Sequence, residues 1–235
     1  MAEEIIQGIR VYYNKTGKGK PLIFVHGMLS DCRAYHRIIR ILSTRYKVYA
    51  VDLPMHGFSG TPPRYFSGKD LAATIDTLAG KLGIINPIIC AHSGGALIAL
   101  ELSKKAKELI LLEPAGQKYN GSMFEFFYSF VIRKAAYDII HNPIRAIALG
   151  INGIWNCTRN IFHPNYWRLF NDNLYRNNIP RGIRCKTTII WADHEEVFDK
   201  KYQQGFKIKN SRTIIVHGNH DWPILRPQEI NKFLS

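Results

Sequence analysis

The sequence contains few cysteines, and their spacing indicates neither a metal site nor a disulfide framework. Only four of the 235 residues are cysteine, and no two of them form a Cys-x-x-Cys pattern. Cys90 lies inside an apolar segment that reads as a buried strand. These features exclude a small disulfide-stapled scaffold and favour a reduced, cytosolic protein. The cysteines are Cys32, Cys90, Cys157 and Cys185.

Long apolar runs are also missing. No segment reaches the roughly 20 apolar residues that a transmembrane helix needs. The first residues, Met1 to Glu4, are acidic and lead into a strand-like stretch. We therefore expect neither an export signal nor a membrane-spanning helix, and we expect a cytoplasmic location.

Acidic residues are scarce relative to basic ones. Asp and Glu number 18 against 32 Lys and Arg, which gives a formal net charge of +14. The excess is spread along the chain, because residues 114–185 hold only nine basic and three acidic residues. We expect a solvated basic surface, with peripheral contact to an anionic membrane or an acidic substrate as the alternative. A nucleic-acid partner is not expected, since no motif of the known binding modules is present.

Seven short apolar segments have the composition of strands that are buried on both faces, being rich in leucine or β-branched residues at odd and even positions. Helical patterns alternate with them near residues 32–44, 69–82, 95–107 and 226–234. This alternation predicts an α/β fold, a mostly parallel sheet with helices on both faces. Residues 17–20, Gly-Lys-Gly-Lys, predict a hairpin turn. The predicted strands are Ile9–Tyr13, Leu22–Val25, Lys47–Val51, Ile88–Ala91, Leu109–Leu112, Thr187–Trp191 and Arg212–Val216.

Residues 114–185 interrupt the alternation. Glycines and prolines break this segment into short helical stretches rich in aromatic residues, and no convincing strand occurs in it. We therefore expect a helical cap, inserted into a core made of residues 1–113 and 186–235.

The composition of the expected cap gives the only hint about a substrate. Aromatic residues crowd the stretch from Met123 to Ile132, and they predict either an apolar lid for an acyl or aromatic group or the small core of the cap itself. Arg133, Lys134 and Arg145 could meet a carboxylate or phosphate of a substrate, or remain solvated.

The most informative segment surrounds Ser93. An apolar strand ends there in a tight turn with the serine at its apex, and an apolar helix follows. Such a turn needs small residues two places before and two places after the serine, because strand and helix approach closely, and Ala91 and Gly95 meet that need. The layout is typical of a nucleophile elbow; the alternative is a helix start with a capping serine.

Loops at the carboxyl ends of parallel strands gather around the ligand, so the partners of Ser93 are sought there. The amide of Gly94, at the start of the helix, would point an unpaired N–H toward a developing oxyanion. The loop after the second predicted strand could turn a second amide, that of Met28, toward the serine. In the neighbouring loops we expect His26 to brace the backbone and Asp52 to make local hydrogen bonds.

A serine hydroxyl needs a general base near neutral pH, and imidazole, with an ordinary pKa of about 6.5, suits that role. The loop after the last predicted strand offers His217 and His220. His220 lies further from the strand on a glycine-containing loop and has the reach, whereas His217 is the alternative. No cysteine or third histidine lies nearby in sequence, so we expect no metal and no cofactor.

One carboxylate should orient this histidine and stabilise its cation, and the loop after Thr187–Trp191 is rich in carboxylates. With these features the chain resembles the α/β-hydrolase-fold enzymes from about residue 20 onward, apart from the expected cap. The resemblance implies that fold, with nucleophile, acid and histidine in this order. The matching motifs are His26-Gly27, the loop from Asp52 to Ser59, the elbow at Ser93, and Gly218-Asn219-His220 followed by Pro227.

The family pattern also bears on which carboxylate is the acid. In the family the acid usually follows a Trp-Gly-x-x-Asp pattern, which implies Glu195 here, with Ala192 in the glycine position. Asp193, closer to the strand, is the alternative. Glu113, directly after the fifth predicted strand, is a third candidate, because some relatives take the acid from that position.

The resemblance implies a serine hydrolase that cleaves a carboxylic ester or thioester of a small molecule through an acyl-enzyme intermediate. Carbon–carbon bond hydrolases, amidases and cofactor-free peroxidases of the same fold also carry a serine and stay open. The alternative from another class is a protein that binds a ligand on this fold without turnover.

Overall fold

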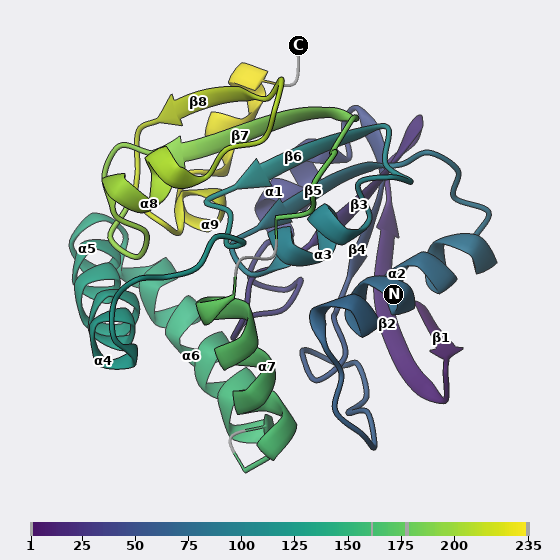
Figure 1. Ribbon diagram of the computed structural model, residues 1–235, viewed down its shortest axis with the longest axis horizontal. Helices are drawn as coiled ribbons and strands as arrows, with labels where there is room; N and C mark the ends of the chain where they lie inside the picture. Colours follow the sequence, from purple (N-terminus) through teal and green to yellow (C-terminus); the bar gives the residue numbers. More distant parts are fainter. Residues whose placement is uncertain (1, 161, 177–178, 234–235) are drawn as a thin grey trace.

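One eight-stranded sheet forms the centre of the computed structural model, which describes residues 2–160, 162–176 and 179–233 (Figure 1). The strand order is β1-β2-β4-β3-β5-β6-β7-β8. Neighbouring strands from β4 to β8 are parallel, whereas β2 pairs antiparallel with both β1 and β4. The strands are β1 (Ala2–Ile6), β2 (Ile9–Thr16), β3 (Lys20–Val25), β4 (Tyr46–Val51), β5 (Ile88–His92), β6 (Glu108–Leu112), β7 (Lys186–Ala192) and β8 (Arg212–Val216).

The central strands are buried because helices cover both faces of the sheet. Every residue of β5 is buried, and alternate residues of β3 enter two separate apolar clusters. The cluster with Ile23 and Val25 includes side chains of α2 and α3, whereas that with Leu22 and Phe24 includes side chains of α1, α9 and η2. The helices of this core are α1 (His36–Leu42), α2 (Gly68–Lys81), α3 (Gly95–Glu101), α8 (Lys200–Gly205), α9 (Trp222–Leu225) and the 3₁₀ helix η2 (Pro227–Phe233).

Between β6 and β7 the regular elements of the described residues are all helical. Figure 1 shows these helices gathered together in teal and green, below the ends of β6 and β7 in that view. No helix in the described part of the chain is long and apolar enough to cross a membrane. The helices are α4 (Met123–Phe127), the π-helix η1 (Tyr128–Arg133), α5 (Lys134–His141), α6 (Pro143–Asn160) and α7 (Pro164–Tyr175).

The predicted α/β fold class is confirmed, and all seven predicted strands occur. The structure adds β1 ahead of them and shortens two helices, because α1 begins only at His36 and α3 ends at Glu101. The last predicted helix, near 226–234, occurs over 227–233 of the described residues. Pro227 has no N–H with which to continue α9, and a 3₁₀ helix follows instead.

The predicted hairpin at residues 17–20 was wrong. These residues do join β2 to β3, but β4 lies between the two strands in the sheet. The apolar β3 lies between β4 and β5, where helices cover both faces of the sheet. Strand β2 is more exposed toward its C-terminal end and lies one strand from the edge, between β1 and β4.

Candidate active site

Ser93 lies at the turn between β5 and α3, in the left-handed region with φ of +48°. Its backbone is fixed by hydrogen bonds from Ser93 N to Leu112 O (2.9 Å) and from Ala115 N to Ser93 O (3.1 Å). Only glycine fits two residues later, because a Cβ on Gly95 would lie 2.5 Å from His26 O. The strand and helix therefore approach as closely as an elbow requires, and the serine is held at its apex.

His220 lies between Ser93 and Glu195. Its Nε2 is 3.0 Å from Ser93 Oγ, and its Nδ1 is 2.9 Å from Glu195 Oε2. Because an ionised carboxylate can only accept, Nδ1 carries a proton, and the neutral ring then presents a lone pair on Nε2 to the serine hydroxyl. The side chains of His220 and Glu195 are 1% and 0% exposed, so this hydrogen-bonded chain is shielded from water.

The electrostatics of this pair match a base and its partner. Burial alone would lower the pKa of His220, but the charge and hydrogen bond of Glu195 outweigh burial and raise it. Burial alone would raise the pKa of Glu195, but His220 and hydrogen bonds, including one from the amide of Phe198, lower it. Val197 N also donates to Glu195 Oε1, at 2.7 Å. The carboxylate thus stays ionised in a buried place.

Glu113 is a second buried carboxyl group next to Glu195. It follows β6 with φ of +45°, and its Oε1 accepts a hydrogen bond from Trp222 Nε1 at 2.9 Å. Burial and the charge of Glu195 raise the pKa of Glu113 well above its usual range, and the two carboxyl groups share a hydrogen bond. Glu113 Oε2 accepts no hydrogen bond among the described residues, so this oxygen is the better placed of the two to hold a proton.

The alternatives Asp193 and His217 lie elsewhere. They contact each other, with Asp193 Oδ2 2.9 Å from His217 Nδ1, and their side chains are 40% and 55% exposed. The structure therefore brings His220 and Glu195 to Ser93 but brings neither His217 nor Asp193 there. Together with His194 they present three groups within reach of one ion, but in an exposed loop.

Met28, Ser93 and Gly94 line the same small pocket. A Cβ on Gly94 would lie 2.4 Å from Met28 Cγ and 3.4 Å from Met28 N, so the two residues lie close together. Neither N–H donates to an acceptor among the described residues. Two free amides next to a serine are the donors that an oxyanion needs.

His92 and Tyr35 join the loops on either side of this site, and the sequence did not single them out. Tyr35 Oη accepts from Gly27 N (3.2 Å) and lies 2.7 Å from His92 Nδ1, while His92 Nε2 lies 2.9 Å from the carbonyl oxygen of His220. Burial, reinforced by His220, lowers the pKa of His92 to about 3. The ring is therefore neutral, its Nε2–H donates to His220 O, and Tyr35 donates to its Nδ1.

His26 and Asp52 hold the neighbouring loops. His26 Nε2 accepts from Leu53 N at 3.0 Å, and Asp52 accepts from Cys32 N at 2.9 Å and from Phe58 N at 3.0 Å. Both side chains therefore make backbone contacts of the kind that the sequence predicts.

A cavity of about 490 Å³ lies over Ser93 and His220. Its walls are mainly apolar, and the aromatic residues of the expected cap divide between two places. Phe127, Phe130 and Trp167 line the cavity, whereas Phe126 and Phe170 join the main core cluster on one face of the sheet. Part of these aromatic residues thus lies over Ser93, and part packs on the sheet rather than in a separate core of the expected cap.

Buried charges bound the cavity on the side of α5. Lys134 Nζ contacts Asp221 Oδ2 and lies 3.4 Å from Asp138 Oδ2, while Asn219 Nδ2 donates to Asp138 Oδ1 at 2.6 Å. Burial and the charge of Asp221 raise the pKa of Asp138 to about 7. The positive charge of Lys134 is therefore balanced by Asp221 within the protein. These contacts also join α5 to the loop that carries His220.

Comparison with known proteins agrees with this fold. The model of the alpha/beta hydrolase family matches residues 22–233, and the chain belongs to this family. It is similar to a putative non-heme haloperoxidase of Mycobacterium phage D29, with 25% identity over 92% of this chain and 77% of that protein. A pimeloyl-[acyl-carrier protein] methyl ester esterase of Nitrosospira multiformis is 28% identical over 40% of this chain and 37% of that protein.

Solved structures show the same fold. The enol-lactonase from Burkholderia xenovorans LB400 superposes with a TM-score of 0.81 at 14% identity, over 98% of this chain and 97% of that one. The meta-cleavage product hydrolase from Pseudomonas fluorescens IP01 gives a TM-score of 0.75 at 16% identity, over 100% and 96% of the two chains. At such identities the likeness shows the fold, and function has to be argued from the site.

Proposed function

We propose that the protein is a serine hydrolase that cleaves a carboxylic ester or thioester through an acyl-enzyme intermediate. The observation that carries this proposal is the continuous hydrogen-bonded chain from Ser93 through His220 to Glu195. In this proposal Ser93 is the nucleophile, His220 the base and Glu195 the acid, with Met28 and Gly94 as oxyanion donors.

The reaction follows from these positions. Ser93 Oγ attacks the carbonyl carbon while its proton passes to His220 Nε2, and the negative oxygen is bound by the amides of Met28 and Gly94. The tetrahedral intermediate collapses, and the leaving alcohol or thiol takes the proton from His220. Water then attacks the acyl-enzyme, gives a proton to His220, and releases the acid as that proton returns to Ser93 Oγ.

The apolar cavity supports a substrate with an acyl chain or an aromatic part. The helices between β6 and β7 supply much of its wall, which supports the assignment of residues 114–185 as a cap. The four cysteines are all unpaired, which supports a reducing, cytoplasmic location. Two of the similar proteins are named as a haloperoxidase and a meta-cleavage product hydrolase. Peroxidase and carbon–carbon bond hydrolase activity therefore remain the alternative activities for a site built on Ser93.

The test is turnover of p-nitrophenyl esters of graded acyl length by the wild type and three variants. We expect Ser93→Ala to lower kcat/KM by on the order of 10⁴-fold or more and Glu195→Gln by about 10³- to 10⁴-fold. Asp193→Asn is the matched control, a carboxylate of the same loop that does not contact His220, and it should change kcat/KM by less than about threefold.

A serine-directed fluorophosphonate gives the second readout, since it should label Ser93 in the wild type and in Asp193→Asn. Absence of both labelling and turnover on esters and thioesters would overturn the proposal and favour ligand binding without turnover. A wild type that is active but equally impaired by Asp193→Asn and Glu195→Gln would overturn the assignment of the acid.

A further inference from the structure

Helices α5 and α6 carry a face of isoleucines whose side chains are largely exposed. Ile140 and Ile144 are 76% and 81% exposed, and four more isoleucines of the same two helices are between 55% and 65% exposed. These four are Ile139, Ile147, Ile151 and Ile154. A continuous exposed apolar face of this kind indicates a surface that contacts a partner molecule or a membrane.

Charge is almost absent from this face. From residue 135 to residue 158 the sequence has only two charged residues, Asp138 and Arg145. Asp138 is one of the buried residues of α5. Arg145 is half-buried and donates to the carbonyl oxygen of Leu225. An apolar face that is flanked by basic groups but carries no exposed acid is typical of a helix that lies in a membrane interface.

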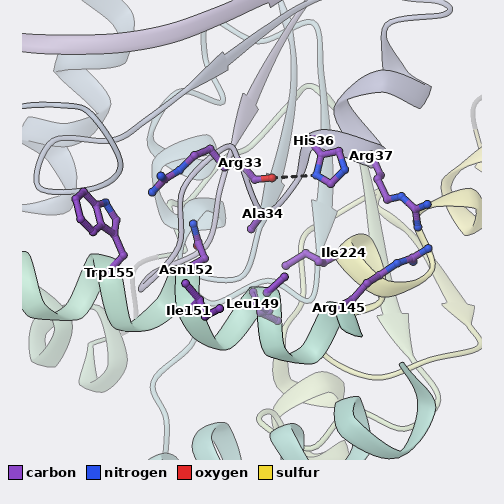
Figure 2. A pocket seen from close by; sticks show the side chains of 11 residues that line it. Arg33, Ala34, His36, Arg37, Arg145, Leu149, Ile151, Asn152, Trp155 and Ile224 are labelled. Atoms are coloured by element: carbon purple, nitrogen blue, oxygen red, sulfur yellow. Dashed lines mark hydrogen bonds between the residues drawn. The ribbon is translucent and has the colours of Figure 1, made fainter. Parts of the chain in front are cut away.

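A basic groove of about 580 Å³ runs beside this face, between α6 and the residues around the start of α1 (Figure 2). Arg33, Arg37 and Arg145 line it, together with His36, and no acidic side chain does. Figure 2 shows Arg37 and Arg145 extending toward the same end of the groove. No ion pair joins either of them to a carboxylate of the described residues, whereas Arg33 is paired with Asp31 at 2.7 Å. Two arginines that line one groove with no acidic side chain form a site for an anion.

The apolar face also borders the cavity above Ser93. Ile139, Ile147 and Ile154 line that cavity and are exposed on the face as well. Leu149 and Ile224 line both the cavity and the basic groove. A molecule held at the face would therefore have its apolar part next to the mouth of the site and its anionic part next to the arginines.

We propose that the α5–α6 face binds the surface of an anionic phospholipid bilayer, with its isoleucines among the acyl chains and Arg37 and Arg145 at the phosphates. This inference deepens and rests on the proposed hydrolase function, since it makes lipid-phase esters the substrate class. The net charge of +14 favours an anionic bilayer over a second copy of the chain, because a second copy would bring its own arginines to the same contact.

The first experiment measures binding without turnover. Ser93→Ala protein is sedimented with sucrose-loaded vesicles of phosphatidylcholine alone, or of phosphatidylcholine with one third phosphatidylglycerol. We expect binding to be at least about tenfold tighter to the anionic vesicles and to weaken between 0.1 M and 0.5 M salt. Equal binding to both vesicles, or none, would overturn the proposal.

Matched variants locate the surface. In the Ser93→Ala background, Ile140→Ser with Ile144→Ser should weaken vesicle binding more than about tenfold. Ile85→Ser should not, although Ile85 is 77% exposed, because it lies in the loop after α2. Arg37→Gln should weaken binding about fivefold, and Arg212→Gln, an exposed arginine at the start of β8, should leave it unchanged. Equal losses in the control variants would contradict the assignment.

Two further readouts separate the possible failures. With Ser93 present, Ile140→Ser with Ile144→Ser should hydrolyse a soluble p-nitrophenyl ester as the wild type does. Lost vesicle binding with intact esterase activity in the wild type would defeat this inference alone, and intact vesicle binding without esterase activity would defeat the proposed function alone. Sedimentation velocity that shows a wild-type dimer converted to a monomer by the isoleucine substitutions would overturn the proposal in favour of a second copy.

Discussion

Glu113 and Glu195 form a buried pair of carboxyl groups that holds one proton. Glu195 receives donors from His220 and from two amides, so it is the ionised partner. Glu113 receives one donor, from Trp222, and its pKa is raised by burial and by Glu195. In the proposed mechanism Glu113 is therefore a neutral donor that positions Glu195.

Glu113→Gln tests this assignment, because the amide keeps both a donor for Glu195 and an acceptor for Trp222. We expect kcat/KM to stay within about threefold of the wild-type value, measured with a p-nitrophenyl ester. Glu113→Ala removes the donor and opens a cavity, so we expect a loss of about tenfold or more and a lower Tm. A Gln variant as impaired as Glu195→Gln would mean that Glu113 is itself the ionised acid.

The pH dependence of activity should report the Glu195–His220 contact. A protonated imidazole cannot accept the proton of Ser93, so activity falls as the pH drops through the pKa of His220. Because Glu195 raises this pKa, we expect the acidic limb of kcat/KM to lie above the ordinary histidine value of about 6.5. In Glu195→Gln burial remains but the charge is gone, so the limb should move to lower pH as the maximal rate falls. A pH profile of both proteins checks this, and an unmoved limb would contradict it.

Part of the site could be predicted from residue types and spacing alone. Ser93, His220 and the carboxylates of the loop after β7 each follow a strand that the apolar pattern reveals, and the parallel sheet brings such loops together. The preference for Glu195 over Asp193 came from the family resemblance. The proton on Glu113 could not be predicted in this way, because it depends on burial and on a contact between distant residues. His92 offered a readable signal, since it directly precedes the serine, but its partners Tyr35 and the His220 carbonyl are set only by the tertiary fold.

At the scale of elements, the strands were easier to predict than the turns. A strand buried on both faces must be apolar at every position, which leaves a clear mark on the sequence of β5 and β6. The order of β2, β4 and β3 in the sheet cannot be read from the sequence in this way. A glycine-rich turn fits both a hairpin between neighbouring strands and a connection to a strand that is not adjacent.

The contact between α5 and the His220 loop makes stability depend on pH. The pKa of Asp138 is raised in the folded protein from 3.8 to about 7, so folding favours its protonated form. Its contribution is complete below the unfolded pKa and is lost as the pH rises through about 7. Asp138→Asn keeps an acceptor for Asn219. We expect the Tm of this variant to fall less than that of the wild type when the pH is raised from 5 to 8. Thermal unfolding followed by circular dichroism checks this, and parallel losses would contradict it.

At the scale of the whole molecule, α6 is fixed to the core by one polar row. Asn152, Asn156 and Asn160 are spaced one turn apart on α6 and face the loops that follow β3 and β4. Asn156 accepts from Gly57 N at 2.8 Å and donates to Asp31 Oδ2 at 2.9 Å. Because these groups are buried, the row joins the helices between β6 and β7 to the core.

Asn156→Ala should therefore destabilise the protein as a whole. It leaves the amide of Gly57 without its acceptor and removes one of the three donors to Asp31 Oδ2, which costs about 1–3 kcal/mol and lowers Tm by about 3–10 °C. We expect a single unfolding transition in both proteins by calorimetry. A separate early transition in the wild type would mean that α4 to α7 unfold on their own, and an unchanged Tm would mean that the row contributes little.

The left-handed backbone at Ser93 has a consequence for laboratory evolution. Glycine adopts this conformation without the steric cost that a side chain meets there, so glycine at this position would relieve strain in the turn between β5 and α3. A selection that rewards heat resistance alone would then drift toward glycine at the position where glycine removes the proposed nucleophile. Thermostable descendants of this chain should therefore be selected for turnover at the same time as for survival.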